Sequence, residues 1–129
     1  MRQAEMKRAV ELRAVKVATA HYRKKGYSVA DTSSTQPYDL LCRKGTNVAH
    51  VEVKGATGGG SAIFLTQNEL EHSRLPGVRT DLFVLGHIRV VGTPDGPRAT
   101  GGKVVANRTN CAFDDANLVP VQWRYMICD

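Results

Sequence analysis

Apolar and polar positions alternate with a helical period at the start of the chain and with a strand period after it. Over residues 3–25, apolar side chains recur every three or four positions, which predicts one amphipathic helix that Gly26 ends. The predicted apolar face consists of Met6, Val10, Ala14, Val15, Val17, Ala18 and Tyr22. A short strand is predicted at residues 27–31, followed by a polar loop through Gln36.

Two apolar stretches at residues 39–42 and 48–54 predict a β-hairpin. The connection Lys44-Gly45-Thr46-Asn47 has glycine first in a two-residue loop, which is typical of a type II′ turn. This register pairs Lys44 with Asn47 and, counted back along both strands, Asp39 with Glu52.

The second half of the chain alternates between short elements and turns. The predicted elements are a mobile glycine-rich loop at 55–61, a short buried strand at 63–65 and a helix with capping-box spacing from Thr66 to about Leu75. They are followed by a strand at 81–86 that can extend to 91, a turn at 92–97, a short strand at 103–106, a helical turn at 113–118 and a last strand at 121–126. Trp123 and Tyr125 are predicted to lie in the core, and the alternative is that they stack on bases. The order predicts an α/β (α+β) fold with a central mixed β-sheet flanked by helices, in which the strand after the second helix runs parallel.

The length and composition narrow the class of protein. A chain of 129 residues predicts a single domain over residues 1–129. No run of about 18 apolar residues and no signal-peptide core occur, so we expect no membrane segment. Three widely spaced cysteines without zinc spacing favour a reducing compartment, so a cytoplasmic protein is expected.

The positive charge is concentrated in the first helix. The chain carries a net charge of +6, and residues 1–26 hold eight basic and two acidic side chains, which accounts for the whole excess. A basic element of this kind suits a polyanion such as nucleic acid. The alternative is a solvated helix face that only aids solubility.

Asp39, Glu52 and Lys54 are the candidate chemical groups. Carboxylates paired across a hairpin would have β-carbons about 5 Å apart and would repel each other, an arrangement that a hard divalent cation between them relieves. Lys54 lies two residues after Glu52 and therefore projects from the same face. Two acids and a lysine on one sheet face are typical of metal-assisted phosphodiester cleavage. The alternative is a surface hairpin whose acids are neutralised by Lys54 and nearby arginines.

Glu11 interrupts the apolar face of the first helix. On a helical wheel it falls between Ala18 and Tyr22, where an unpaired carboxylate is costly. Either Glu11 reaches the acidic site, or it forms an ion pair with Lys7 one turn earlier.

Five segments in order resemble the PD-(D/E)XK nuclease superfamily, and more closely the branch found at the C-terminus of the plant NO VEIN protein and beside bacterial restriction helicases. They are Val10-Glu11, residues 26–29, residues 38–41, residues 51–55 and residues 64–69. The resemblance covers about residues 5–90 and leaves a C-terminal extension of about 91–129. It implies a restriction-endonuclease-like core. Tyr38 separates Pro37 from Asp39, whereas the family has proline directly before the aspartate.

The resemblance implies a metal-dependent endonuclease that acts on DNA in restriction, phage defence or repair. Asp39, Glu52, the Val53 carbonyl and Glu11 would hold Mg²⁺, for which Mn²⁺ can substitute. Lys54 would position the attacking water or help to deprotonate it, and would offset the charge that develops on the phosphorane. The family also implies a homodimer, and no organic cofactor is expected.

Other residues are weaker candidates for contacts with nucleic acid. They are Lys24, Lys25, Gly58, Gly59, Ser61, Thr66 and Asn68. His50 and His72 show no partner spacing, so no chemistry is expected of them. Three alternatives stay open: an inactive nucleic-acid-binding module, an interaction subunit of a larger defence or repair complex, and a structure-specific nuclease similar to Holliday-junction resolvases.

Overall fold

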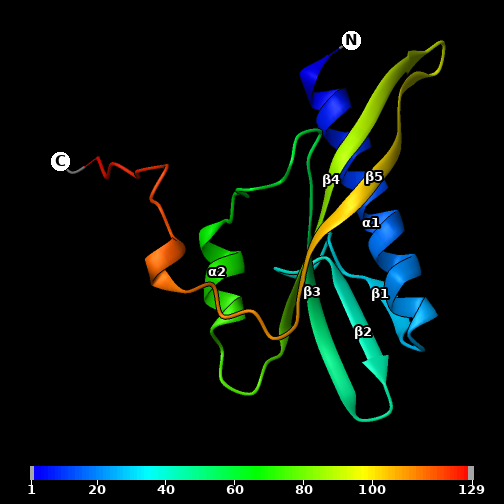
Figure 1. Ribbon diagram of the computed structural model, residues 1–129. Coiled ribbons are helices and arrows are strands. Elements are labelled where there is room, and N and C mark those ends of the chain that lie inside the picture. The colour runs from blue at the N-terminus through cyan, green and yellow to red at the C-terminus, as the bar shows by residue number, and fades with distance from the viewer. Residues whose placement is uncertain (1, 128–129) are drawn as a thin grey trace.

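The computed structural model describes residues 2–127 and shows two helices on opposite sides of one twisted sheet (Figure 1). The elements in chain order are α1 (Gln3–Lys24), β1 (Ser28–Asp31), β2 (Leu40–Lys44), β3 (Asn47–Gly55), α2 (Gln67–Ser73), β4 (Thr80–Thr93), β5 (Gly96–Arg108) and the 3₁₀ helix η1 (Asp115–Asn117). The fold is therefore α+β, as predicted, with a long helix packed on a five-stranded mixed sheet.

The strands follow the sheet in sequence order, β1-β2-β3-β4-β5. Strand β2 pairs antiparallel with β3, and Lys44 lies opposite Asn47, which confirms the predicted hairpin register. Strand β4 runs parallel to β3, also as predicted, because α2 lies in the connection between them. Strands β4 and β5 form a long antiparallel hairpin that contains the strand predicted at residues 103–106.

Helix α1 packs closely on the sheet because its buried face is small. Ala14 and Ala18 are fully buried, with Val10 and Tyr22 above and below them. A side chain at Gly55 would place its Cβ 3.0 Å from the Cβ of Ala14, so any residue larger than glycine would force α1 and β3 apart at this crossing. Val51 and Val53 belong to the same buried cluster, so the odd-numbered residues of β3 face α1.

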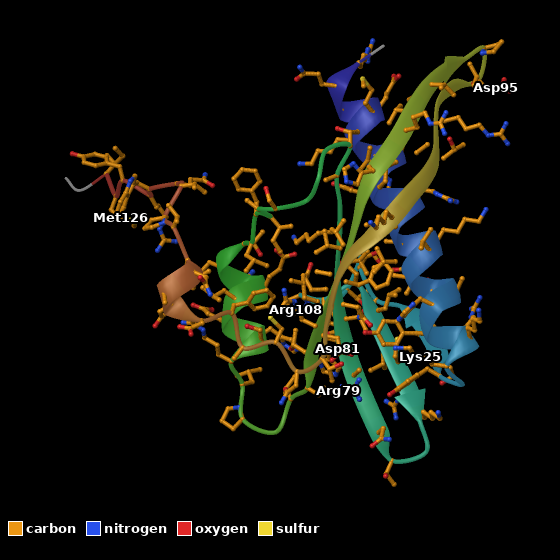
Figure 2. All side chains as sticks on the ribbon, in the orientation of Figure 1. Lys25, Arg79, Asp81, Asp95, Arg108 and Met126 are labelled. Carbon is orange, nitrogen blue, oxygen red and sulfur yellow. The ribbon has the colours of Figure 1, made fainter. Side chains whose placement is uncertain are left out.

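A buried polar network joins α1 to β4 on this side of the sheet. The Asp81 carboxylate is 1% exposed and accepts hydrogen bonds from the Tyr22 hydroxyl at 2.7 Å and from Arg79 Nη2 at 2.9 Å. Arg79 Nε and the backbone N–H of Asn110 each donate a further hydrogen bond to Asp81 Oδ1, both at 3.0 Å. Figure 2 shows Arg79 and Asp81 together at this end of β4. The network is fully hydrogen-bonded and fixes the segment after β5 to the sheet.

Two predicted strands are absent from the described part of the chain. Residues 63–65 form an irregular connection in which Phe64 is 76% exposed, because β4 takes the place beside β3 that this segment would need. The segment 121–126 also forms no strand, and Trp123 and Tyr125 are both 86% exposed rather than buried. The prediction that these aromatic residues lie in the core was wrong. Figure 2 shows Met126 in this segment, well away from the sheet.

The helical predictions are close to the structure. Thr66 caps α2 with a complete capping box, although the helix ends at Ser73 rather than near Leu75. The helical turn predicted at residues 113–118 is η1. Among the described residues, no helix has the length and apolar character needed to cross a membrane.

Candidate active site

The candidate site lies on the side of the sheet that faces α2, opposite α1. Asp39 immediately precedes β2, and its backbone N–H donates to the Val51 carbonyl at 3.0 Å. Its side-chain oxygen Oδ2 accepts a hydrogen bond from the Val53 N–H at 2.8 Å. The Asp39 carboxylate is therefore fixed against β3 at the level of Glu52, as the predicted pairing requires.

Glu52 and Lys54 project from β3 toward α2. Their neighbours Val51 and Val53 face α1, so strand alternation places Glu52 and Lys54 on the opposite face. Glu52 is only 3% exposed, and Lys54 Nζ lies 3.6 Å from Glu52 Oε1. The structure thus brings Asp39, Glu52 and Lys54 together on one face.

Glu69 of α2 is a fourth member that the sequence reasoning missed. Its carboxylate oxygens lie 3.0 and 3.3 Å from Lys54 Nζ. Glu69 Oε1 also accepts the N–H of Thr66 at 2.8 Å, which completes the capping box. The capping spacing explained Glu69 by itself, and only the crossover from β3 to β4 reveals that the same carboxylate reaches Lys54.

Burial and neighbouring charges shift the pKa values of the two glutamates in opposite directions. Burial, a hydrogen bond with Glu69 and the charge of Asp39 raise the pKa of Glu52 to about 10, against the opposing charge of Lys54. For Glu69, burial is outweighed by hydrogen bonds from Glu52 and the Thr66 N–H and by Lys54, which together lower its pKa. At neutral pH Glu52 is therefore protonated and Glu69 ionised, so the pair shares one proton beside the Lys54 ammonium.

A groove of about 680 Å³ runs along the site between α2 and the loop before β2. Asp39 and Glu69 line it, together with Thr66 and Asn68 of the α2 N-terminus. The opposite wall consists of Ser33, Ser34, Thr35, Gln36, Pro37 and Tyr38. The walls are mainly polar and suit a hydrophilic ligand.

His50, His72 and Tyr38 form a stacked group at one end of the groove. His50 Nδ1 and His72 Nε2 lie 2.7 Å apart, and the Tyr38 ring stacks on His50 with centroids 3.9 Å apart. Burial lowers the pKa of both histidines. The sequence spacing gave no sign of this contact, because it does not show that α2 folds back over β3. Their hydrogen bond joins α2 to the sheet.

Glu11 is not brought to the site. Its side chain is 49% exposed on α1 and forms an ion pair with Arg8 at 3.9 Å, rather than with Lys7. The prediction that Glu11 lies within the buried face of α1 was wrong. The buried residues of this helix form a narrow stripe that consists of Val10, Ala14, Ala18 and Tyr22. The sheet separates α1 from Glu52 and Lys54.

The weaker candidates divide between two regions. Lys24 and Lys25 are exposed at the end of α1, and Figure 2 shows Lys25 on the side of the sheet away from α2. The glycine-rich loop instead crosses the α2 side of β4, where the Gly58 carbonyl accepts the His87 N–H at 2.8 Å. Gly59 and Ser61 are exposed in this loop. Only the loop and the α2 N-terminus therefore share a face with the acidic residues.

Comparison with known proteins identifies the family. The family described as "Protein NO VEIN, C-terminal" matches residues 10–99, which include Asp39, Glu52, Lys54 and Glu69. The chain belongs to this family. The comparisons found no match among curated proteins and none among solved structures.

The donor set of this NO VEIN C-terminal domain fits Mg²⁺ in its chemistry. Mg²⁺ takes oxygen ligands, keeps several waters and often uses one or two carboxylates, which Asp39 can supply and Glu52 can supply once a bound cation has displaced its proton. Within residues 2–127, no group of three or more His, Cys, Asp or Glu side chains is arranged to hold a metal ion. A cation at this site would therefore depend on two carboxylates, water and the oxygens of a bound ligand.

Proposed function

We propose that the domain is a metal-dependent endonuclease that hydrolyses phosphodiester bonds in DNA. The observation that carries the proposal is the grouping of Asp39, Glu52 and Lys54 on one sheet face beside a polar groove. Opposed carboxylates next to a lysine have little structural purpose on a hairpin, since repulsion and burial both oppose them.

Asp39 and Glu52 are the residues that would hold Mg²⁺ in this proposal. The cation would lower the pKa of a bound water and stabilise charge on the reacting phosphate. Lys54 lies between Glu52 and Glu69, and its role in the proposal is electrostatic: it stabilises the negative charge that develops on the phosphate oxygens. Glu69 is a positioning residue, because it holds the Lys54 ammonium 3.0 Å away and is itself fixed by the helix cap.

The groove supports a nucleic-acid substrate. Thr66 and Asn68 border it on one side and the polar residues 33–36 on the other, so hydroxyl and amide groups face a ligand that lies across Asp39. Homodimer formation, which would present two such sites to a duplex, remains part of the proposal.

A second candidate function is binding of nucleic acid without catalysis. One observation favours it: the Lys54 ammonium compensates the acids of the site, at 3.6 Å from Glu52 and 3.0 Å from Glu69. In that case the lysine would replace the cation. Metal-linked stabilisation that requires Asp39 separates the two functions.

The test is cleavage of a substrate panel with Mg²⁺ or Mn²⁺ by the wild type and by Asp39→Asn, Glu52→Gln and Lys54→Ala. The panel holds duplex, single-stranded, flap and four-way-junction DNA, and RNA. We expect metal-dependent cleavage that each substitution reduces at least 100-fold, while Glu11→Gln serves as the matched acid-to-amide control and retains activity. Cleavage that survives Glu52→Gln and Lys54→Ala, or no cleavage of any substrate with DNA binding intact, would overturn the proposal.

A further inference from the structure

The hairpin of β4 and β5 extends well beyond the rest of the sheet as a two-stranded ribbon. Figure 1 shows this part, residues 86–103, reaching past the ends of β2 and β3, and Figure 2 places Asp95 at its tip. The strands stay paired to the end, from Gly86 opposite Lys103 to Thr93 opposite Gly96. We call residues 86–103 the β4–β5 arm.

One face of the β4–β5 arm packs against the body of the domain. Ile88 is 3% exposed in the main core, and Val90 and Ala99 pack against it from paired positions. The Arg13 side chain of α1 donates from Nε to the Gly101 carbonyl at 2.9 Å. These contacts fix the direction of the arm, so the charges on its other face hold their relative positions.

The other face of the β4–β5 arm is exposed and basic. Arg89 alternates with Ile88 and Val90, so it points away from α1, and Arg98 is paired with Val91 on the same face. Lys103 lies opposite Gly86, which faces the glycine-rich loop on the α2 side of β4, so Lys103 is on that face as well. The positive φ of His87 (55°) shifts the alternation of faces between Gly86 and Ile88. Arg89, Arg98 and Lys103 are all exposed, and the arm has a single acidic residue, Asp95, in its terminal turn.

This basic face continues the face that carries the candidate active site. Lys54 of β3 is paired with Val84 of β4. The glycine-rich loop crosses β4 at Gly86, where a Cβ built on Gly86 would lie 3.1 Å from the Gly58 carbonyl oxygen. At about 3.4 Å per residue, Arg89 and Arg98 lie roughly 15–25 Å from the level of Lys54. That distance corresponds to about four to seven base pairs of B-DNA at 3.4 Å each.

We propose that the β4–β5 arm binds duplex DNA on one side of the site. Its ribbon would lie along the major groove, and Arg89, Arg98 and Lys103 would contact phosphates. This rests on the proposed function. A two-stranded ribbon fits the major groove of B-DNA, which is about 12 Å wide, whereas the major groove of A-form RNA is too deep and narrow for side chains. The exposed cations match the charge of the phosphate backbone without a competing acid on that face.

The test measures binding of a labelled 20-base-pair DNA duplex in EDTA at 50–200 mM salt, so that no catalysis is involved. The arm variant is Arg89→Gln/Arg98→Gln, and the matched control is Lys16→Gln/Arg23→Gln, which removes the same charge from exposed positions on α1. The loss of two phosphate contacts makes the slope of log K against log salt shallower by about 1.8. The ratio of wild-type to variant affinity therefore falls about tenfold between 50 and 200 mM salt. The variant Arg89→Lys/Arg98→Lys retains the slope.

The outcomes separate the arm from the nuclease. If the arm variant and the α1 control have the same slope, or if the wild type binds an RNA duplex as tightly as DNA, the role of the arm is overturned. Cleavage in a parallel assay with Mn²⁺, together with unchanged DNA binding by the arm variant, would support the nuclease activity and contradict the role of the arm. A selective loss of slope in a protein that does not cleave would support the arm and contradict the nuclease.

Discussion

Replacing Glu52 by glutamine tests the electrostatics of the site without any assumption about catalysis. Burial and its neighbours raise the pKa of Glu52 from 4.5 to about 10 in the folded protein. In the unfolded chain the same carboxyl ionises near its ordinary pKa. The folded state therefore retains a proton that the unfolded state has released at every pH between these two values.

The direction in which stability changes with pH follows from this difference in bound protons. Because the unfolded state binds fewer protons above pH 4.5, stability falls as pH rises from about 5 toward 10, by about 1.4 kcal/mol per pH unit. At pH 8 the accumulated cost is on the order of 5 kcal/mol. Glutamine has the shape of the protonated acid, cannot ionise and can still donate to Glu69, so Glu52→Gln removes the cost.

The assay is urea denaturation in EDTA at pH 5 to 9 for the wild type and Glu52→Gln, with Glu71→Gln as the control at an exposed glutamate of α2. We expect similar stabilities of wild type and Glu52→Gln at pH 5 and a stability advantage of several kcal/mol for the variant at pH 8. The control follows the wild type. Parallel pH profiles for wild type and Glu52→Gln, or a variant less stable than the wild type at pH 8, would refute the reasoning.

Two further predictions concern the packing of the sheet. Gly55→Ala should destabilise the domain by about 1–3 kcal/mol through overpacking, because the new Cβ would lie 3.0 Å from the Cβ of Ala14. Thermal unfolding measures the loss, and Gly58→Ala is the control because no atom lies within contact distance of a Cβ at that position. Asp81→Asn should cost about 3–5 kcal/mol at pH 7 by leaving Arg79 without its buried partner. Burial is outweighed by the Asp81 hydrogen bonds, so its pKa is lowered, and the difference from wild type should shrink as pH falls below 4 in denaturation experiments.

The sequence was sufficient where short-range rules determine the structure. The glycine-first loop gave the register of β2 and β3, and this register correctly placed Asp39 beside β3 and put Glu52 and Lys54 on one face. The capping spacing correctly located the start of α2 at Thr66. In each case the decisive interaction joins residues within one hairpin or one helical turn.

Predictions failed where the outcome depends on which distant segment occupies a face. Glu11 was assigned by helical periodicity alone, but the width of the buried stripe on α1 depends on the strands beneath it. Trp123 was predicted to lie in the core, yet its segment forms no strand in the described structure and its side chain is exposed. The first strand of the β4–β5 arm and its turn were predicted close to their observed places, but β5 was predicted only at residues 103–106. Its first part was missed because Pro97, Gly101 and Gly102 interrupt the strand pattern that pairing with β4 sustains.

The dual role of Glu69 shows how the local and distant interactions meet at the candidate site. Its Oε1 accepts the Thr66 N–H at 2.8 Å and also lies 3.0 Å from Lys54 Nζ, so one carboxylate begins α2 and holds the lysine. The hydrogen bond between His50 and His72, at 2.7 Å, joins the same helix to the same strand one turn further on. Because both contacts connect α2 to β3, the position of the Lys54 ammonium depends on how this short helix docks. The sequence located each partner separately, and the parallel crossover from β3 to β4 brings them together.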